Sequence, residues 1–107
     1  MSSLEFRIRP AARRDLEAYT DYLTAEAGND VAQRFIDNGQ MSFAALAATP
    51  GLGPPVPSRD VRLTGLRKWR IDGFPKLLVF YIPTSSNIQI VRVLHAAQDW
   101  TTLLDAD

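Results

Sequence analysis

The sequence predicts an α+β fold in which a strand, two helices and three further strands form a single domain over residues 1–107. Three observations predict it. Residues 4–9 alternate apolar and charged side chains, the period of a strand with one buried face. Apolar residues then recur every three or four positions between residues 12 and 47, which is typical of amphipathic helices. Two runs rich in β-branched and aromatic residues, 77–82 and 88–95, have the composition of a β-hairpin.

Two helices are expected between residues 10 and 48. Pro10 suits the first position of a helix, because its missing N–H has no intrahelical partner there. Gly28 is a typical helix end, and the Asn29-Asp30 pair is predicted to be the N-cap of the second helix. Because so short a joint reverses the chain, the helices should form an antiparallel hairpin. Each carries one apolar stripe, so both should pack on one face of the sheet.

The remaining chain predicts a connector and three antiparallel strands. Residues 49–58 contain four prolines and two glycines, which indicate an extended connector. A strand over 65–71, a turn over 72–75 and the two hairpin strands should form a meander, because strands joined by four or five residues are antiparallel neighbours. A short helix over 99–104 should follow. The sheet face away from the helices is expected to be less covered and to collect the strand-borne arginines.

Composition excludes several kinds of site. The chain has no cysteine, so disulfides, thiolate metal sites and a cysteine nucleophile are excluded. With one histidine and no clustered carboxylates, we expect neither a metal nor another cofactor. No apolar run approaches the length of a membrane span, and no signal pattern opens the sequence, so we expect a cytoplasmic protein without membrane contact.

Charge is unevenly distributed along a chain whose formal net charge is zero. Residues 15–58 carry six acidic side chains and one basic, whereas residues 59–98 carry seven basic and two acidic. One interpretation is a positive surface for an acidic partner. The other is that two oppositely charged layers attract each other within the fold, and the sequence leaves both open.

Several polar residues on the predicted strands are candidates for chemistry. Strand alternation places Arg67 with Trp69 on one face and Lys68 with Arg70 on the other. Arg92 interrupts an apolar strand and therefore requires a partner, either Asp99 or a helix carboxylate. A lone histidine at a strand end, His95, is more often structural than catalytic. The sequence shows no Ser/His/Asp or glycine-loop signature.

Matching positions between residues 6 and 100 carry a family resemblance. The most specific is the segment Ile90-Val91-Arg92-Val93-Leu94-His95, followed by Asp99-Trp100. The others are Pro10, Ala12, Asp15-Leu16, Tyr22, Ala32, Phe35, Ile36, Leu46, Thr49-Pro50-Gly51, Leu66-Arg67 and Phe80-Tyr81. Together they resemble the ParE branch of the RelE/ParE toxin superfamily. The resemblance implies the fold predicted above and the toxin half of a bacterial type II toxin–antitoxin system, of the kind associated with plasmid stabilisation.

The resemblance implies a toxin that inhibits DNA gyrase by binding, without catalytic residues. The candidate target contacts are Arg67, Arg70, Arg92, His95, Gln98 and Trp100. A ParD-like antitoxin would neutralise it by placing an amphipathic helix in an apolar groove against the helical hairpin and an extended segment along the sheet. The candidate contacts are Tyr19, Tyr22 and Phe43. DNA would be contacted only indirectly, through the antitoxin.

Two alternatives stay open. One is a RelE-like ribosome-dependent mRNA endonuclease, in which Lys68, Arg67, Arg92, Tyr81 or His95 would supply the acid, base and positive charge. The small number of lysines, two in the whole chain, and the neutral net charge argue against it. The other is a degenerate, non-toxic member that still binds its antitoxin. The family pattern His-Gly-x-Arg-Asp reads His95-Ala96-Ala97-Gln98-Asp99 here, which replaces a glycine and an arginine.

Overall fold

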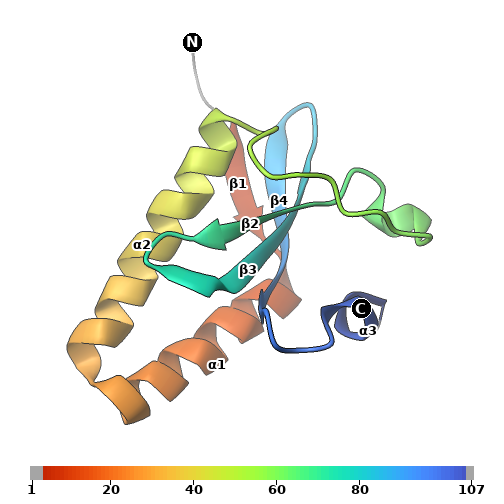
Figure 1. Ribbon diagram of the computed structural model, residues 1–107. Coiled ribbons are helices and arrows are strands. Elements are labelled where there is room, and N and C mark those ends of the chain that lie inside the picture. The colour runs from red at the N-terminus through yellow and green to blue at the C-terminus, as the bar shows by residue number, and fades with distance from the viewer. Residues whose placement is uncertain (1–3, 106–107) are drawn as a thin grey trace.

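The computed structural model describes residues 4–105 and confirms the predicted α+β architecture (Figure 1). Its elements are β1 (Glu5–Ile8), α1 (Pro10–Ala27), α2 (Asn29–Ala48), the short 3-10 helix η1 (Val61–Leu63), β2 (Arg67–Ile71), β3 (Phe74–Pro83), β4 (Asn87–His95) and α3 (Trp100–Asp105). The sheet order is β1-β4-β3-β2. The last three strands form the predicted antiparallel meander, and β1 pairs with β4 in parallel because the helical hairpin provides the crossover. Within the described residues, no helix is long and apolar enough to cross a membrane.

A single glycine joins the two helices. Gly28 has a φ of 92°, a conformation that a side chain would make costly. Its N–H donates to the Leu23 carbonyl at 3.1 Å, and its carbonyl accepts from the Ala32 N–H at 3.2 Å. The predicted N-cap was wrong, because Asn29 is already the first residue of α2 and no side chain caps this helix. The glycine reverses the chain within one residue, which leaves no position for a separate cap.

Glycines also move the predicted bounds of β2 and its turn. The predicted strand over 65–71 begins only at Arg67, because Gly65 has a φ of 83° and turns the chain. The predicted four-residue turn is shorter than expected. Phe74 already belongs to β3 and pairs with Ile71, so that only Asp72 and Gly73 form the turn. Gly73 supplies the positive φ that so tight a reversal requires.

The sheet is covered on both faces, which corrects the expectation of a less covered face. Figure 1 shows α1 and α2 on one side and the connector with α3 on the other. The helix-side core includes Phe35, Phe43, Leu46, Val79, Tyr81 and Ile90. The second core includes Val56, Leu63, Leu66, Phe80, Val91, Leu94 and Leu104. Neighbouring residues of β3 therefore point into different cores, and the connector is apolar because it covers the second one.

The Tyr81 hydroxyl fixes the start of this connector. It donates to the Pro50 carbonyl at 2.9 Å and accepts from the Gly53 N–H at 2.9 Å. Arg67 Nη1 donates to the Gly53 carbonyl at 2.6 Å. A Cβ at Gly53 would collide with the backbone of Lys68, so that only glycine permits the chain to lie this close to β2.

Replacing Tyr81 with phenylalanine should lower the free energy of unfolding by about 1–3 kcal/mol, because the Pro50 carbonyl and the buried Gly53 N–H lose their partner. Urea unfolding measures this loss. Tyr22→Phe is the matched control, since the Tyr22 side chain is 56% exposed and its substitution should be nearly neutral.

The same substitution has an expected pH dependence. Burial raises the pKa of the Tyr81 hydroxyl, and the Gly53 N–H and the charge of Arg67 oppose this shift only in part. The contribution of the protonated hydroxyl is present below the unfolded-state pKa of about 10 and is lost as the pH rises through the higher folded-state pKa. The stability difference between the wild type and Tyr81→Phe should therefore narrow above pH 10. A constant difference would contradict this account.

Candidate target-binding and antitoxin-binding surfaces

Arg92 forms an ion pair inside the fold. Its Nε donates to Asp15 Oδ2 at 2.7 Å and its Nη2 to Asp15 Oδ1 at 2.9 Å, while the two side chains are only 13% and 14% exposed. Its Nη1 donates to the Leu103 carbonyl at 3.1 Å, which links β4 to α3. The partner of Arg92 is thus a helix carboxylate, which was one of the two partners predicted from the sequence. The other alternative, Asp99, accepts instead from the Thr102 hydroxyl at 2.8 Å.

The sheet pairing explains why Asp15 lies at this point. β1 ends where Ile8 pairs with Ile90, so that the edge of β4 is open beyond it. An irregularity in the pairing of β4 with β3 places Arg92 opposite Phe80. The N–H of Val93 then donates to Asp15 Oδ2 at 3.0 Å. The carboxylate of α1 therefore satisfies both a strand N–H and the guanidinium beside it.

His95 and Gln98 close the turn between β4 and α3. The His95 N–H donates to Gln98 Oε1 at 2.7 Å, and the Gln98 N–H donates to the His95 carbonyl at 2.9 Å. The Ala97 N–H donates to His95 Nδ1 at 3.0 Å. An arginine at position 98 has donors but no acceptor, so it could not accept from the His95 N–H. The glutamine that stands at position 98 in place of the family's arginine therefore supplies an acceptor that this turn uses.

Trp100 lies on the sheet face away from the helices, whereas Arg70 lies at the outer edge of β2, in a hollow with Met41 and Trp69. Trp100 is half-buried, with its ring centroid 5.3 Å from that of Phe80. Lys68 Nζ lies 5.4 Å from the centre of the Trp100 ring. Arg70 is exposed, with its guanidinium 4.7 Å from the Trp69 ring. Of the six predicted target contacts, Trp100 and Arg70 are thus the ones without a hydrogen bond of their side chains among residues 4–105.

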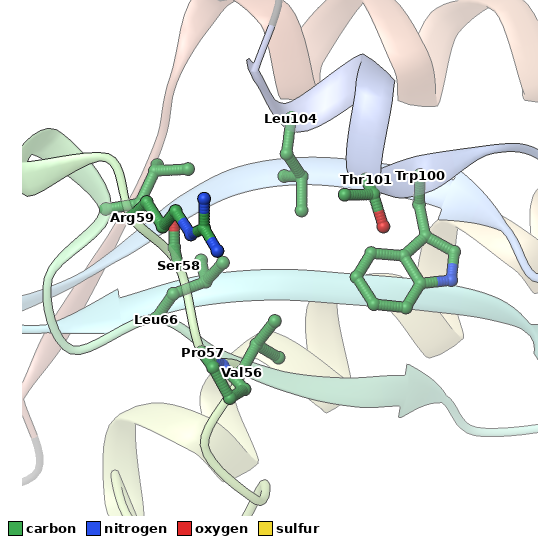
Figure 2. A pocket seen from close by; sticks show the side chains of 9 residues that line it. Val56, Pro57, Ser58, Arg59, Leu66, Trp100, Thr101 and Leu104 are labelled. Carbon is green, nitrogen blue, oxygen red and sulfur yellow. The ribbon is translucent and has the colours of Figure 1, made fainter.

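A slot beside Trp100 was missed from the sequence. It has a volume of about 240 Å³ and lies between the connector and α3, as Figure 2 shows. Val56, Leu63, Leu66, Trp100 and Leu104 form its apolar walls, and Ser58 and Arg59 lie at one end. The apolar residues of the proline-rich stretch could have indicated it, because a connector that is fully exposed to solvent does not need them.

The residues that a nuclease would require do not converge. Tyr81 belongs to the helix-side core, and Arg67 pairs with it across the β2–β3 ladder. Lys68 pairs with Phe80, which belongs to the opposite core. Arg92 is held by Asp15 at the edge of the sheet. His95 lines one hollow with Arg92, but Tyr81, Arg67 and Lys68 do not line it, so the five candidates do not face one common space.

The antitoxin candidates lie around α1, with one exception. Tyr22 is 56% exposed, and Tyr19 beside it is half-buried, with their ring centroids 5.4 Å apart. Burial raises the pKa of Tyr19, and the neighbouring Tyr22 adds to the shift. Phe43 is only 1% exposed and packs against Phe6, so its choice as an exposed aromatic was wrong. The Phe43 side chain belongs to the apolar stripe of α2, which faces the sheet rather than solvent.

A groove between α1 and α2 is the second surface of interest. Its volume is about 400 Å³. Leu16, Phe35 and Phe43 contribute apolar lining, while Ile36 is 41% exposed beside them. Charged and polar side chains complete the lining, namely Arg13, Glu17, Thr20, Asp21 and Gln40. An apolar floor with a polar rim fits the apolar face of an amphipathic helix.

Nowhere in residues 4–105 do three histidine, aspartate or glutamate side chains come together as a metal would require.

Comparison with known proteins decides the family. Residues 6–100 match the family described as "ParE toxin of type II toxin-antitoxin system, parDE". The chain belongs to the ParE toxin family. It is therefore a ParE-type toxin of a ParDE type II toxin–antitoxin system, which confirms the resemblance drawn from its sequence.

Solved structures agree with this fold. The toxin is similar to a chain of the "Chromosomal ParDE TA system from P. aeruginosa", with a TM-score of 0.69 and 18% sequence identity. The match covers 87% of this toxin and 96% of that chain, and at this identity it shows the fold alone. No curated protein matches the sequence.

Proposed function

We propose that this ParE-type toxin inhibits DNA gyrase by binding to it and so blocks replication in the bacterial cytoplasm. The observation that carries the proposal is the dispersion of the nuclease candidates. Cleavage of RNA needs a general base, a general acid and positive charge around one phosphate. Here Tyr81 holds the connector, Arg92 holds Asp15, and Lys68 lies on the opposite side of the sheet from Tyr81. A toxin that acts by binding needs no such constellation.

The surface that gyrase would contact is the sheet face that carries Trp100. The slot between the connector and α3 offers an apolar pocket for a target side chain, with Arg59 at its end. Lys68 lies beside the Trp100 ring, and Arg70 extends the positive charge to the outer edge of β2. Apolar anchors with arginines at the edge are typical of protein interfaces. Arg67, Arg92, His95 and Gln98 would act indirectly, because they hold the connector and the turn to α3.

The proposed antitoxin surface is the groove between α1 and α2. An amphipathic helix of a ParD-like antitoxin would place its apolar face on Ile36 and the aromatic floor. Tyr19 and Tyr22 lie in a neighbouring hollow with His95 and Gln98, where an adjoining segment of the antitoxin would continue. In this arrangement the antitoxin reaches the turn that positions Trp100, which links binding to neutralisation.

Induction of the toxin alone in a bacterium tests the proposed target. We expect growth arrest, a loss of negative supercoiling in plasmid DNA and intact mRNA. Cuts in mRNA that depend on ribosomes would favour the RelE-like nuclease instead. Normal growth with full-length protein in the lysate would identify a non-toxic member, for which Ala96 and Gln98 are the first residues to examine.

Arg70→Glu sharpens the test. Arg70 is exposed and makes no ion pair among residues 4–105, so its reversal should leave the fold intact. We expect it to weaken inhibition of purified gyrase by about tenfold, as the loss of a charge at an interface does. Arg34→Glu on α2 is the matched control, because it changes the same charge at an exposed position outside the proposed surface. Equal inhibition by wild type and Arg70→Glu would place the target surface elsewhere.

A further inference from the structure

The fold brings four arginines together from distant parts of the sequence. Arg9 and Arg14, at the start of α1, line one hollow with Arg62 of η1, and this hollow has a volume of about 310 Å³. Leu63 of η1 lines both this hollow and the Trp100 slot, which Arg59 also lines. The four arginines therefore lie around η1 in two hollows that share Leu63, and we call them the arginine track.

The track is strongly positive although the toxin is neutral overall. Asp60 is the acidic residue that lines it, and Arg62 binds this carboxylate with an Nη2–Oδ2 distance of 2.6 Å. The side chains of Arg9, Arg14 and Arg59 make no ion pair or hydrogen bond with any part of the chain that the structure describes. Six of the twelve acidic residues lie further along α1 and on α2, so the neutral net charge of the toxin hides a separation of charge between its surfaces.

The arginine at the beginning of α1 is unfavourable for stability. Arg9 occupies the N-cap position, where it makes no side-chain cap, and the first turn contains no acidic residue. Serine or aspartate at this position would bond a free N–H of the first turn, whereas a positive charge opposes the helix dipole. Arg9 therefore lowers the stability of α1, which indicates that its role is in binding rather than in folding.

We infer that this arginine track binds the phosphate backbone of DNA directly. Guanidinium groups match phosphate oxygens through two parallel hydrogen bonds. A track that extends over two hollows fits a ligand with closely repeated charge, and duplex DNA carries one charge per about 1.7 Å of its axis. A single carboxylate of a protein partner would occupy only one hollow. The inference changes the expectation that DNA is contacted only through the antitoxin, and it does not depend on gyrase.

The test is direct binding of a fluorescent DNA duplex of mixed sequence to the full-length toxin, followed by anisotropy between about 50 and 200 mM salt. Each phosphate contact adds about 0.9 to the slope of log affinity against log salt concentration. The double variant Arg9→Ser/Arg14→Gln should therefore lower this slope by about 2 and weaken binding by at least about tenfold at the lowest salt.

Two controls make the outcome decisive. Arg34→Gln/Lys76→Gln removes the same net charge at exposed positions outside the track and should retain the wild-type slope. Arg9→Ser alone should keep or raise the melting temperature while it weakens binding, because serine can cap α1. A lower melting temperature would show that Arg9 is structural. Equal loss in the control variant, no DNA binding by the wild type, or tighter binding of poly-L-glutamate than of DNA would overturn the inference.

Discussion

Replacing Arg92 with methionine should lower the free energy of unfolding by about 3 kcal/mol, because it leaves the carboxylate of Asp15 without its cation in a nearly buried position. The loss should be large for a second reason. Arg92 also donates to the Leu103 carbonyl, so that the substitution releases α3 from β4. We expect the melting temperature to fall by more than about 10 °C, as this loss implies for a domain of this size.

A double-mutant cycle with Asp15→Asn separates the ion pair from packing. The coupling energy should be about 2 kcal/mol, within the range found for residues in one network. The exposed pair of Arg62 and Asp60 is the control that the chain itself offers, since the Arg62 side chain is 65% exposed. Arg62→Met should change stability far less, because water screens this pair. Equal losses at the two pairs would show that burial does not set the strength of the Arg92 pair.

Local sequence patterns were sufficient for most elements. The apolar stripes predicted the helices, and Pro10 and Gly28 correctly marked the bounds of α1. The alternation of residues 66–71 correctly separated Arg67 from Lys68 across β2. The errors concerned the N-cap of α2 and the length of the turn before β3, where the chain reverses at a glycine with positive φ, at Gly28 and Gly73. A turn that depends on one positive φ is shorter than its composition suggests.

The candidate surfaces were less predictable, because they depend on contacts between distant residues. Asp15 and Arg92 are 77 positions apart, and a helix carboxylate was only one of two partners considered. The second core was missed because the connector resembles an exposed loop in composition, although its Val56 is buried, as are Leu63 and Leu66 further along the chain. The arginine track was missed for a related reason. Charge counted by segment separated Arg9 and Arg14 from Arg59 and Arg62, and only the fold unites them.

Replacing Ile36 with glutamate should weaken antitoxin binding by about a hundredfold or more, which corresponds to about 2.7 kcal/mol. Ile36 lies beside the apolar floor of the α1–α2 groove and is 41% exposed in the free toxin. A carboxylate there would have to lose its water against the apolar face of the bound helix, and in the groove the two carboxylates Glu17 and Asp21 outnumber the single cation Arg13. The fold itself should tolerate the change, because the position is exposed.

Met41→Glu is the matched control for this prediction. Met41 lies on the same helix and is 65% exposed, but it lines a different hollow with Trp69 and Arg70. Calorimetric titration with the antitoxin of the same operon should show the loss for Ile36→Glu and nearly wild-type affinity for Met41→Glu. In cells, the antitoxin should neutralise Met41→Glu but not Ile36→Glu. The opposite ranking would place the antitoxin helix over the outer edge of β2, and the groove would then have to serve another purpose.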